Sequence, residues 1–118
     1  MKPATLQETA SSDAIASIRA ALQLSQEAFA RMLQVSVRTI VRWEKEGDEP
    51  PALERERLEL IHELARIAGE IMEKDDIPAW FSTPKAAFSG KKPLDLLSTF
   101  RGIQQVRERL EQARWGVF

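Results

Sequence analysis

Apolar side chains recur at intervals of three and four residues along most of this chain, and this spacing constrains the fold more than any other feature. Residues spaced in this way share one face of an α-helix, whereas a half-buried strand alternates apolar and polar residues. The longest run covers about 20 residues, or roughly 30 Å of helix. Its apolar members are Leu53, Leu60, Ile61, Leu64, Ile67, Ala68, Ile71 and Met72. No run alternates as a strand would, so the sequence predicts an all-α fold.

The length of 118 residues permits one compact body or two small modules that share a core. It excludes a large enzyme with separate cofactor and substrate domains. The chain has no cysteine, which excludes a disulfide framework and a thiolate zinc site. The start lacks a basic stretch followed by an apolar block, and no apolar run approaches the roughly 20 residues that span a bilayer. We therefore expect a cytoplasmic protein with no membrane partner.

Turn-forming residues and changes of apolar pattern divide the chain into four segments. They are a flexible arm at 1–12, three short helices of a helix-turn-helix bundle at 13–50, a long connecting helix at 51–76 and a small helical module at 77–118. Ser25 and Ser36 are suited to cap the second and third helices, because their hydroxyl groups can accept from free backbone amides. The fold expected is thus a helix-turn-helix bundle joined by a long helix to a small C-terminal helical module.

The C-terminal module is expected to contain two helices. A proline starts a short one at Pro93 to Leu97, since proline suits the first helical position. The last helix is expected from Gln104 to Trp115, and Gly116 should end it.

The formal net charge is only −1, but the charges are distributed unevenly. Acids outnumber bases between Glu49 and Asp75, and bases outnumber acids after Asp76. An acidic middle segment would be turned away from a nucleic acid, leaving the charges near Arg38 and Arg42 to face it.

The run IRAALQLSQEAFARMLQVSVRTIVRWE, from Ile18 to Glu44, resembles the Xre helix-turn-helix family of phage-type repressors. The resemblance implies that operator DNA is a partner and that the helix starting at Val37 enters the major groove. Its base-facing positions would be Val37, Arg38 and Arg42, and its phosphate contacts Gln26, Ser36 and Thr39. An arginine can form a bidentate bond with guanine. Because one such module offers few contacts, we expect a homodimer on paired half-sites.

The same resemblance makes predictions about the scaffold. It implies an ion pair between Arg19 and Glu44 that ties the recognition helix to the first helix. The family usually has glycine where this chain has Gln34, at a turn that favours a left-handed backbone. Trp43 is expected to pack against the long helix rather than stack on a base.

Much of the second half is similar to the toxin-binding domain of Xre/MbcA/ParS antitoxins. The matching residues are Trp80, Phe81, Pro84, Phe88, Gly90, Pro93 to Leu97, Gly102, Val106, Leu110 and Gly116 to Phe118. The resemblance implies an antitoxin that neutralises a RES-domain toxin, an NAD-degrading enzyme, by covering its active site, and that represses its own operon. By the same analogy, the candidate toxin-binding residues are Arg101, Arg107, Arg114, Trp115, Gly116, Val117 and Phe118.

The sequence is compatible with two other functions. A stand-alone transcription regulator would use the C-terminal module for dimerisation or for an effector, and an adaptor would have lost DNA binding. An enzyme is not expected, because the single histidine, His62, has no nucleophile or metal partner near it in the sequence. The carboxylates of Glu59, Glu63, Glu70 and Glu73 are better explained as a solvated helix face than as a metal site. No cofactor, metal or catalytic residue is predicted.

Overall fold

The computed structural model describes the backbone of residues 3–116 and the side chains of residues 11–116. The described residues form α-helices joined by turns and short 3-10 helices, which confirms the all-α prediction. The α-helices are α1 (Pro3–Leu22), α2 (Gln26–Leu33), α3 (Val37–Glu44), α4 (Ala52–Ile71), α5 (Ile77–Ser82) and α6 (Phe100–Arg114). The 3-10 helices are η1 (Lys74–Asp76), η2 (Ala86–Phe88) and η3 (Pro93–Leu96). Within 3–116, strand pairing is limited to one antiparallel bridge, between Lys85 and Lys91.

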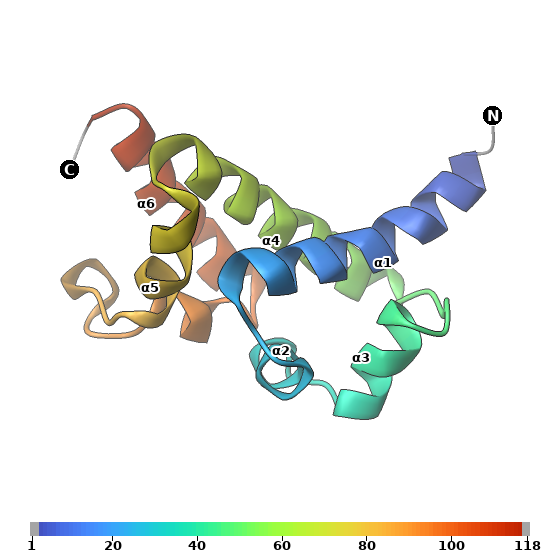
Figure 1. The fold of residues 1–118 in the computed structure, drawn as a ribbon. Coiled ribbons are helices and arrows are strands. Elements are labelled where there is room, and N and C mark those ends of the chain that lie inside the picture. The colour runs from blue at the N-terminus through green and yellow to red at the C-terminus, as the bar shows by residue number, and fades with distance from the viewer. Residues whose placement is uncertain (1–2, 117–118) are drawn as a thin grey trace.

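Helix α1 crosses the middle of the molecule, with α2 and α3 below it and α4 above it in the view of Figure 1. It packs against α3 and α4, and α4 packs in turn against α6. Helices α5 and α6 lie at the end of the molecule away from α3 (Figure 1). The helix-turn-helix and the C-terminal module are therefore joined through α1 and α4.

A single core runs through both halves of the chain. Its fully buried members include Ile15 of α1, Phe29 of α2, Ile61 of α4, Phe81 of α5 and Leu110 of α6. Burying a side chain of this size is worth about 1.5–3 kcal/mol relative to leaving it exposed. Because these residues form one cluster, the two modules stabilise each other.

Several helix boundaries differ from those predicted. Helical backbone begins at Pro3, so residues 3–12, expected as a flexible arm, continue α1 instead of preceding a helix start at Asp13. Within this extended helix, the Ser12 hydroxyl donates to the carbonyl oxygen of Trp43 at 2.9 Å. Helix α6 begins at Phe100 rather than Gln104, because the side chain of Thr99 caps it.

The long central helix is shorter than the predicted segment 51–76. Pro51 is the N-cap residue rather than the first helical residue, and α4 ends at Ile71. The backbone then becomes extended at Met72 and Glu73. This break lets α5 turn back, so that Ile77 is buried in the core. Within the described part of the chain, no helix has both the length and the apolar character needed to cross a membrane.

Candidate functional site

Helices α2 and α3 form the predicted helix-turn-helix, and serine side chains cap both. The Ser25 hydroxyl accepts from the backbone N–H of Ala28 at 3.0 Å, and the Ser36 hydroxyl accepts from that of Thr39 at 3.0 Å. Each cap satisfies one of the free amides at a helix start. Both capping predictions are confirmed.

The turn between the two helices passes through Gln34 in the left-handed conformation, with φ 61°. Its backbone N–H donates to the carbonyl oxygen of Arg31 at 3.2 Å, and that of Val35 donates to Ala30 at 3.0 Å. A residue other than glycine in this conformation costs about 1 kcal/mol. The turn thus keeps the geometry that a glycine would favour, as predicted.

The predicted base-facing residues lie together on the outer side of α3. Val37 and Arg38 are exposed, and the side chain of Arg42 is 42% exposed. Arg38 and Arg42 are four residues apart, so they share one helix face. The arrangement leaves both guanidinium groups available to a ligand that approaches α3 from solvent.

The predicted phosphate contacts surround the starts of α2 and α3. The hydroxyl groups of Ser36 and Thr39 are 2.8 Å apart at the beginning of α3. Gln26 is the first residue of α2, but its side chain is half-buried and its amide Nε2 donates to Glu44 Oε1 at 3.3 Å. One amide hydrogen of Gln26 therefore belongs to the scaffold, and its second one remains for another acceptor.

The predicted ion pair between Arg19 and Glu44 is confirmed. Arg19 Nη1 donates to both carboxylate oxygens of Glu44, at 2.9 and 3.0 Å, and its Nε donates to the carbonyl oxygen of Leu24 at 3.0 Å. The Glu44 side chain is only 8% exposed. Because Glu44 ends α3 and Arg19 lies on α1, the pair fixes α3 against α1.

Trp43 is 3% exposed and belongs to the core, so its ring is not available to stack on a base. Its structural role is confirmed, although α3 packs chiefly against α1 and α2 rather than against α4. Arg31 and Lys45, the other cations of this region, are exposed.

The candidate toxin-binding residues of α6 have different environments. Arg101 is exposed in the first turn, and Arg107 lies 3.7 Å from the Glu111 carboxylate. Arg114 bridges two helices, with Nη2 2.8 Å from Glu70 Oε1 on α4 and Nη1 3.3 Å from Glu111 Oε1. Arg114 therefore helps to hold α6 against α4.

The end of α6 presents a large aromatic ring to solvent. Trp115 is 74% exposed, and Gly116 follows it with φ +75°, which confirms the predicted glycine stop. Two further candidates, Val117 and Phe118, lie outside the described residues. Trp115 and Arg107 line the same hollow. Tryptophan and arginine are both enriched in contact surfaces between proteins.

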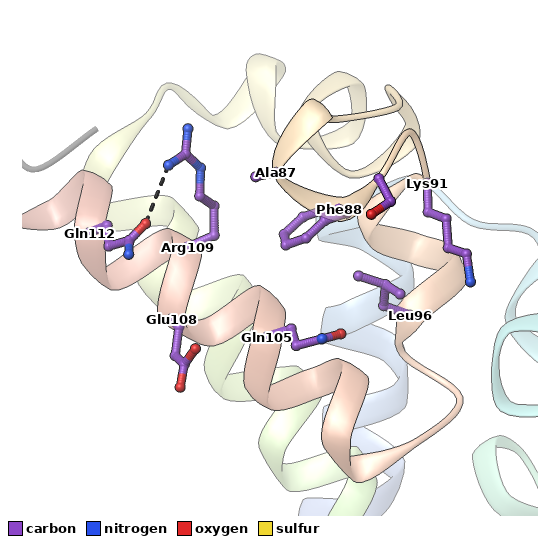
Figure 2. A pocket seen from close by; sticks show the side chains of 9 residues that line it. Ala87, Phe88, Lys91, Leu96, Gln105, Glu108, Arg109 and Gln112 are labelled. Atoms are coloured by element: carbon purple, nitrogen blue, oxygen red, sulfur yellow. Dashed lines mark hydrogen bonds between the residues drawn. The ribbon is translucent and has the colours of Figure 1, made fainter.

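We call the side of α6 that carries Glu108 and Gln112 its outer face. This face forms a ridge between two hollows. The first hollow lies between α6 and the segment around η2 and η3 (Figure 2), and is lined by Ala87, Phe88, Ser89, Lys91, Leu96, Gln105, Glu108, Arg109 and Gln112. The second is lined by Gln104, Arg107, Glu108, Glu111, Gln112 and Trp115. Two residues, Glu108 and Gln112, line both hollows, so the hollows adjoin along this helix.

Cations surround the η2 segment next to the first hollow. The Lys85 ammonium lies 4.9 Å from the centre of the Trp80 ring, a cation–π distance. Burial lowers the pKa of Lys85 below its usual value, and the positive charge of Arg109 lowers it further. This part of the C-terminal module is thus electropositive, in agreement with the charge distribution in the sequence.

Arg57 joins the two modules, a role that the sequence analysis missed. It is 8% exposed, its Nη2 donates to the carbonyl oxygen of Leu33 at 3.2 Å, and its Nη1 donates to that of Ser98 at 2.7 Å. Leu33 ends α2 and Ser98 precedes α6. One guanidinium therefore caps α2 and holds the connection between η3 and α6. In the sequence, Arg57 is one of several bases in an acidic helix, and nothing distinguishes it from a solvated charge.

His62 is exposed on α4, as expected for a surface residue. The carboxylates of the same helix are engaged by arginine: Arg66 donates to Glu63 and to Glu70. The hydrogen bond from Arg66 holds the pKa of Glu63 below its usual value. Among the side chains that the structure describes, no cluster of three or more His, Cys, Asp or Glu could hold a metal ion.

Comparison with known families divides the chain in two. A helix-turn-helix family model matches residues 15–61, and the model of the antitoxin Xre/MbcA/ParS C-terminal toxin-binding domain matches residues 64–116. The two matches meet within α4, so each module includes part of this helix. Comparison with curated protein sequences finds no match.

Among solved structures, the fold is similar to that of a chain in the M. tuberculosis MbcT-MbcA toxin-antitoxin complex. The TM-score is 0.75, the identity is 23%, and the alignment covers 91% of this chain and 96% of that one. The likeness therefore extends over both modules and shows that the two chains share the same fold.

Proposed function

Since this chain belongs to the antitoxins that join a helix-turn-helix domain to an Xre/MbcA/ParS C-terminal toxin-binding domain, we propose that it neutralises a RES-domain, NAD-degrading toxin and represses its own operon. The observation that carries the proposal is the presence of both domains on one core. The solved chain with a similar fold is a component of a toxin-antitoxin complex, which supports a toxin as the partner.

The geometry of α3 supports operator binding as the regulatory half of this function. Arg38 and Arg42 share an exposed face, and free amides lie at the start of the same helix near Ser36. Arginines read guanine edges in the major groove, and helix N-termini bind phosphate. The protein would bind as a homodimer to two half-sites about one helical turn apart.

We expect Arg38→Ala and Arg42→Ala each to weaken operator binding by about 1–3 kcal/mol and to relax base preference at one position. Gln26→Ala should weaken binding to all sequences alike, because a phosphate contact carries no base information. Binding to the DNA upstream of the gene would be measured at physiological salt against a scrambled duplex. The matched control is Arg101→Ala, which removes the same charge from an exposed position on α6. Equal affinity of the unaltered protein for both duplexes would contradict operator binding.

The outer face of α6 supports toxin binding. Trp115 extends into solvent at the end of α6, and the two hollows lie along the length of this helix. We propose that this ridge, with Arg101, Arg107 and the segment 115–118, covers the active site of the toxin. Aromatic and arginine side chains contribute most of the binding energy in many protein interfaces.

Deleting residues 115–118 is expected to release the toxin while leaving operator binding nearly intact. The fold should tolerate the deletion because Trp115 is 74% exposed and Arg114 keeps its ion pair with Glu70. The test is co-expression with the neighbouring gene product, with growth and cellular NAD as readouts. The double variant Arg38→Ala with Arg42→Ala should show the reverse, full protection without operator binding. If the truncated protein still protects cells fully, the tail is not the inhibitory element. If no neighbouring product depletes NAD or binds the chain, the protein is a stand-alone regulator.

A further inference from the structure

An acidic side chain contacts one of the two arginines on the outer face of α3. Arg42 Nε donates to Asp48 Oδ2 at 2.9 Å. Both side chains remain accessible, at 42% and 53% exposure. An exposed ion pair of this kind contributes little to folding stability. What distinguishes this contact is its position, on the face of α3 that carries both arginines.

The backbone after α3 brings this carboxylate back to the helix. Gly47 has φ +79°, a left-handed conformation that reverses the chain. The backbone N–H of Asp48 then donates to the carbonyl oxygen of Arg42 at 3.0 Å, and that of Glu46 donates to the same oxygen at 3.2 Å. Asp48 thus contacts Arg42 twice, through its backbone and through its side chain.

This contact leaves the part of the guanidinium that recognises guanine unoccupied. Arginine has five N–H donors in a rigid plane, and Asp48 engages only the one on Nε. The two terminal nitrogens can still donate to guanine O6 and N7. Because the contact restricts a side chain that is otherwise mobile, less conformational entropy is lost when DNA binds.

Arg38 provides an internal comparison, four residues earlier on the same face. It makes no hydrogen bond or ion pair with any side chain that the structure describes, so it keeps its rotamer freedom. The two arginines that the proposed function assigns to base reading thus differ in how they are held.

We propose that Asp48 is a positioning residue for base recognition by Arg42. The proposal rests on the proposed operator binding: Asp48 orients the guanidinium before DNA arrives, and so sharpens the guanine preference at the position that Arg42 reads. As a negative charge near the DNA it would also weaken binding to every sequence slightly. Its effect on preference and its effect on overall affinity therefore have opposite signs.

The test is selection of binding sites from a random duplex library with the full-length protein and its variants. We expect Asp48→Ala to lower guanine preference at the Arg42 position by roughly 3- to 10-fold, part of the discrimination that one bidentate contact provides. Base preference at the position in the DNA that Arg38 reads should not change. Asp48→Asn should retain most of the preference, because its amide oxygen can still accept from Nε.

Glu46→Ala is the matched control, because it removes the same charge from the same loop while Asp48 still contacts Arg42. It should raise affinity for all duplexes alike and leave base preference unaltered. Unchanged preference in Asp48→Ala, with affinity raised as in Glu46→Ala, would overturn the proposal and leave operator binding intact. Absence of any base preference in the unaltered protein would overturn both operator binding and the positioning role of Asp48. The unaltered protein alone reveals this outcome, so it cannot be confused with an effect of a substitution.

Discussion

Replacing Gly102 with alanine is expected to destabilise the protein by about 3 kcal/mol or more, because the new methyl group has no space. A Cβ atom at this position would lie 1.8 Å from the carbonyl oxygen of Leu96 and 2.7 Å from its carbonyl carbon. Both are backbone atoms, which cannot move aside as the end of a flexible side chain can. The first turn of α6 would have to separate from η3.

The consequences of this separation should extend beyond the C-terminal module. Helix α6 supplies Ile103, Val106 and Leu110 to the shared core. For a chain of this size, a loss of about 3 kcal/mol lowers the melting temperature by roughly 10 °C or more. Thermal unfolding followed by circular dichroism measures this directly. The proposed toxin neutralisation should fall with it, since the outer face of α6 depends on the same helix.

Gly69→Ala is the matched control. Gly69 lies within α4 and is exposed, and a Cβ atom there would meet nothing within 4 Å. Alanine is the better helix former by about 1 kcal/mol, so this substitution should leave stability unchanged or raise it. If Gly102→Ala melts at the temperature of Gly69→Ala, the close approach of η3 to α6 does not exist in solution.

Local signals in the sequence predict much of the helix-turn-helix. Ser25 and Ser36 are caps that act within three residues, and Gln34 occupies a turn whose conformation depends on its immediate neighbours. The pair between Arg19 and Glu44 spans a longer distance, and only the family resemblance predicts it. These features follow from short-range chemistry or from a shared pattern.

The features that the sequence does not predict depend on tertiary contacts. Arg57 binds carbonyl oxygens that are 24 and 41 residues away, and no local pattern predicts such partners. Asp48 reaches Arg42 only because the chain reverses at Gly47. The start of α1 is not predicted for a different reason, since residues 3–12 lack the apolar period by which a helix is recognised.

Arg57→Ala is expected to cost about 3 kcal/mol of folding stability and to weaken both proposed functions. Breaking a buried hydrogen-bonded charge network is typically worth 3–5 kcal/mol, and each carbonyl oxygen left without a donor contributes about 1–3 kcal/mol. Here two carbonyl oxygens lose their donor, those of Leu33 and Ser98, and Glu54 loses a cation 3.7 Å away.

Arg57→Lys separates the charge from the geometry. A single ammonium keeps the positive charge near Glu54 but cannot reach both carbonyl oxygens as a planar guanidinium does. We therefore expect an intermediate loss of stability. Amide hydrogen exchange should quicken at both places that Arg57 joins, the end of α2 near Leu33 and the segment around Ser98.

Arg55→Ala is the control for removing an arginine from the same helix. The Arg55 side chain is 38% exposed, and its partners are close in the sequence. Its Nη1 donates to the Pro50 carbonyl oxygen at 3.0 Å and lies 3.5 Å from Glu49 Oε1. Its loss should cost less than about 1 kcal/mol, as is usual for exposed pairs. Equal stability of Arg57→Ala and Arg55→Ala in urea unfolding would show that the buried guanidinium does not join the modules. A larger loss in Arg57→Ala, with faster exchange on both sides, would show that the helix-turn-helix and the C-terminal module depend on one side chain.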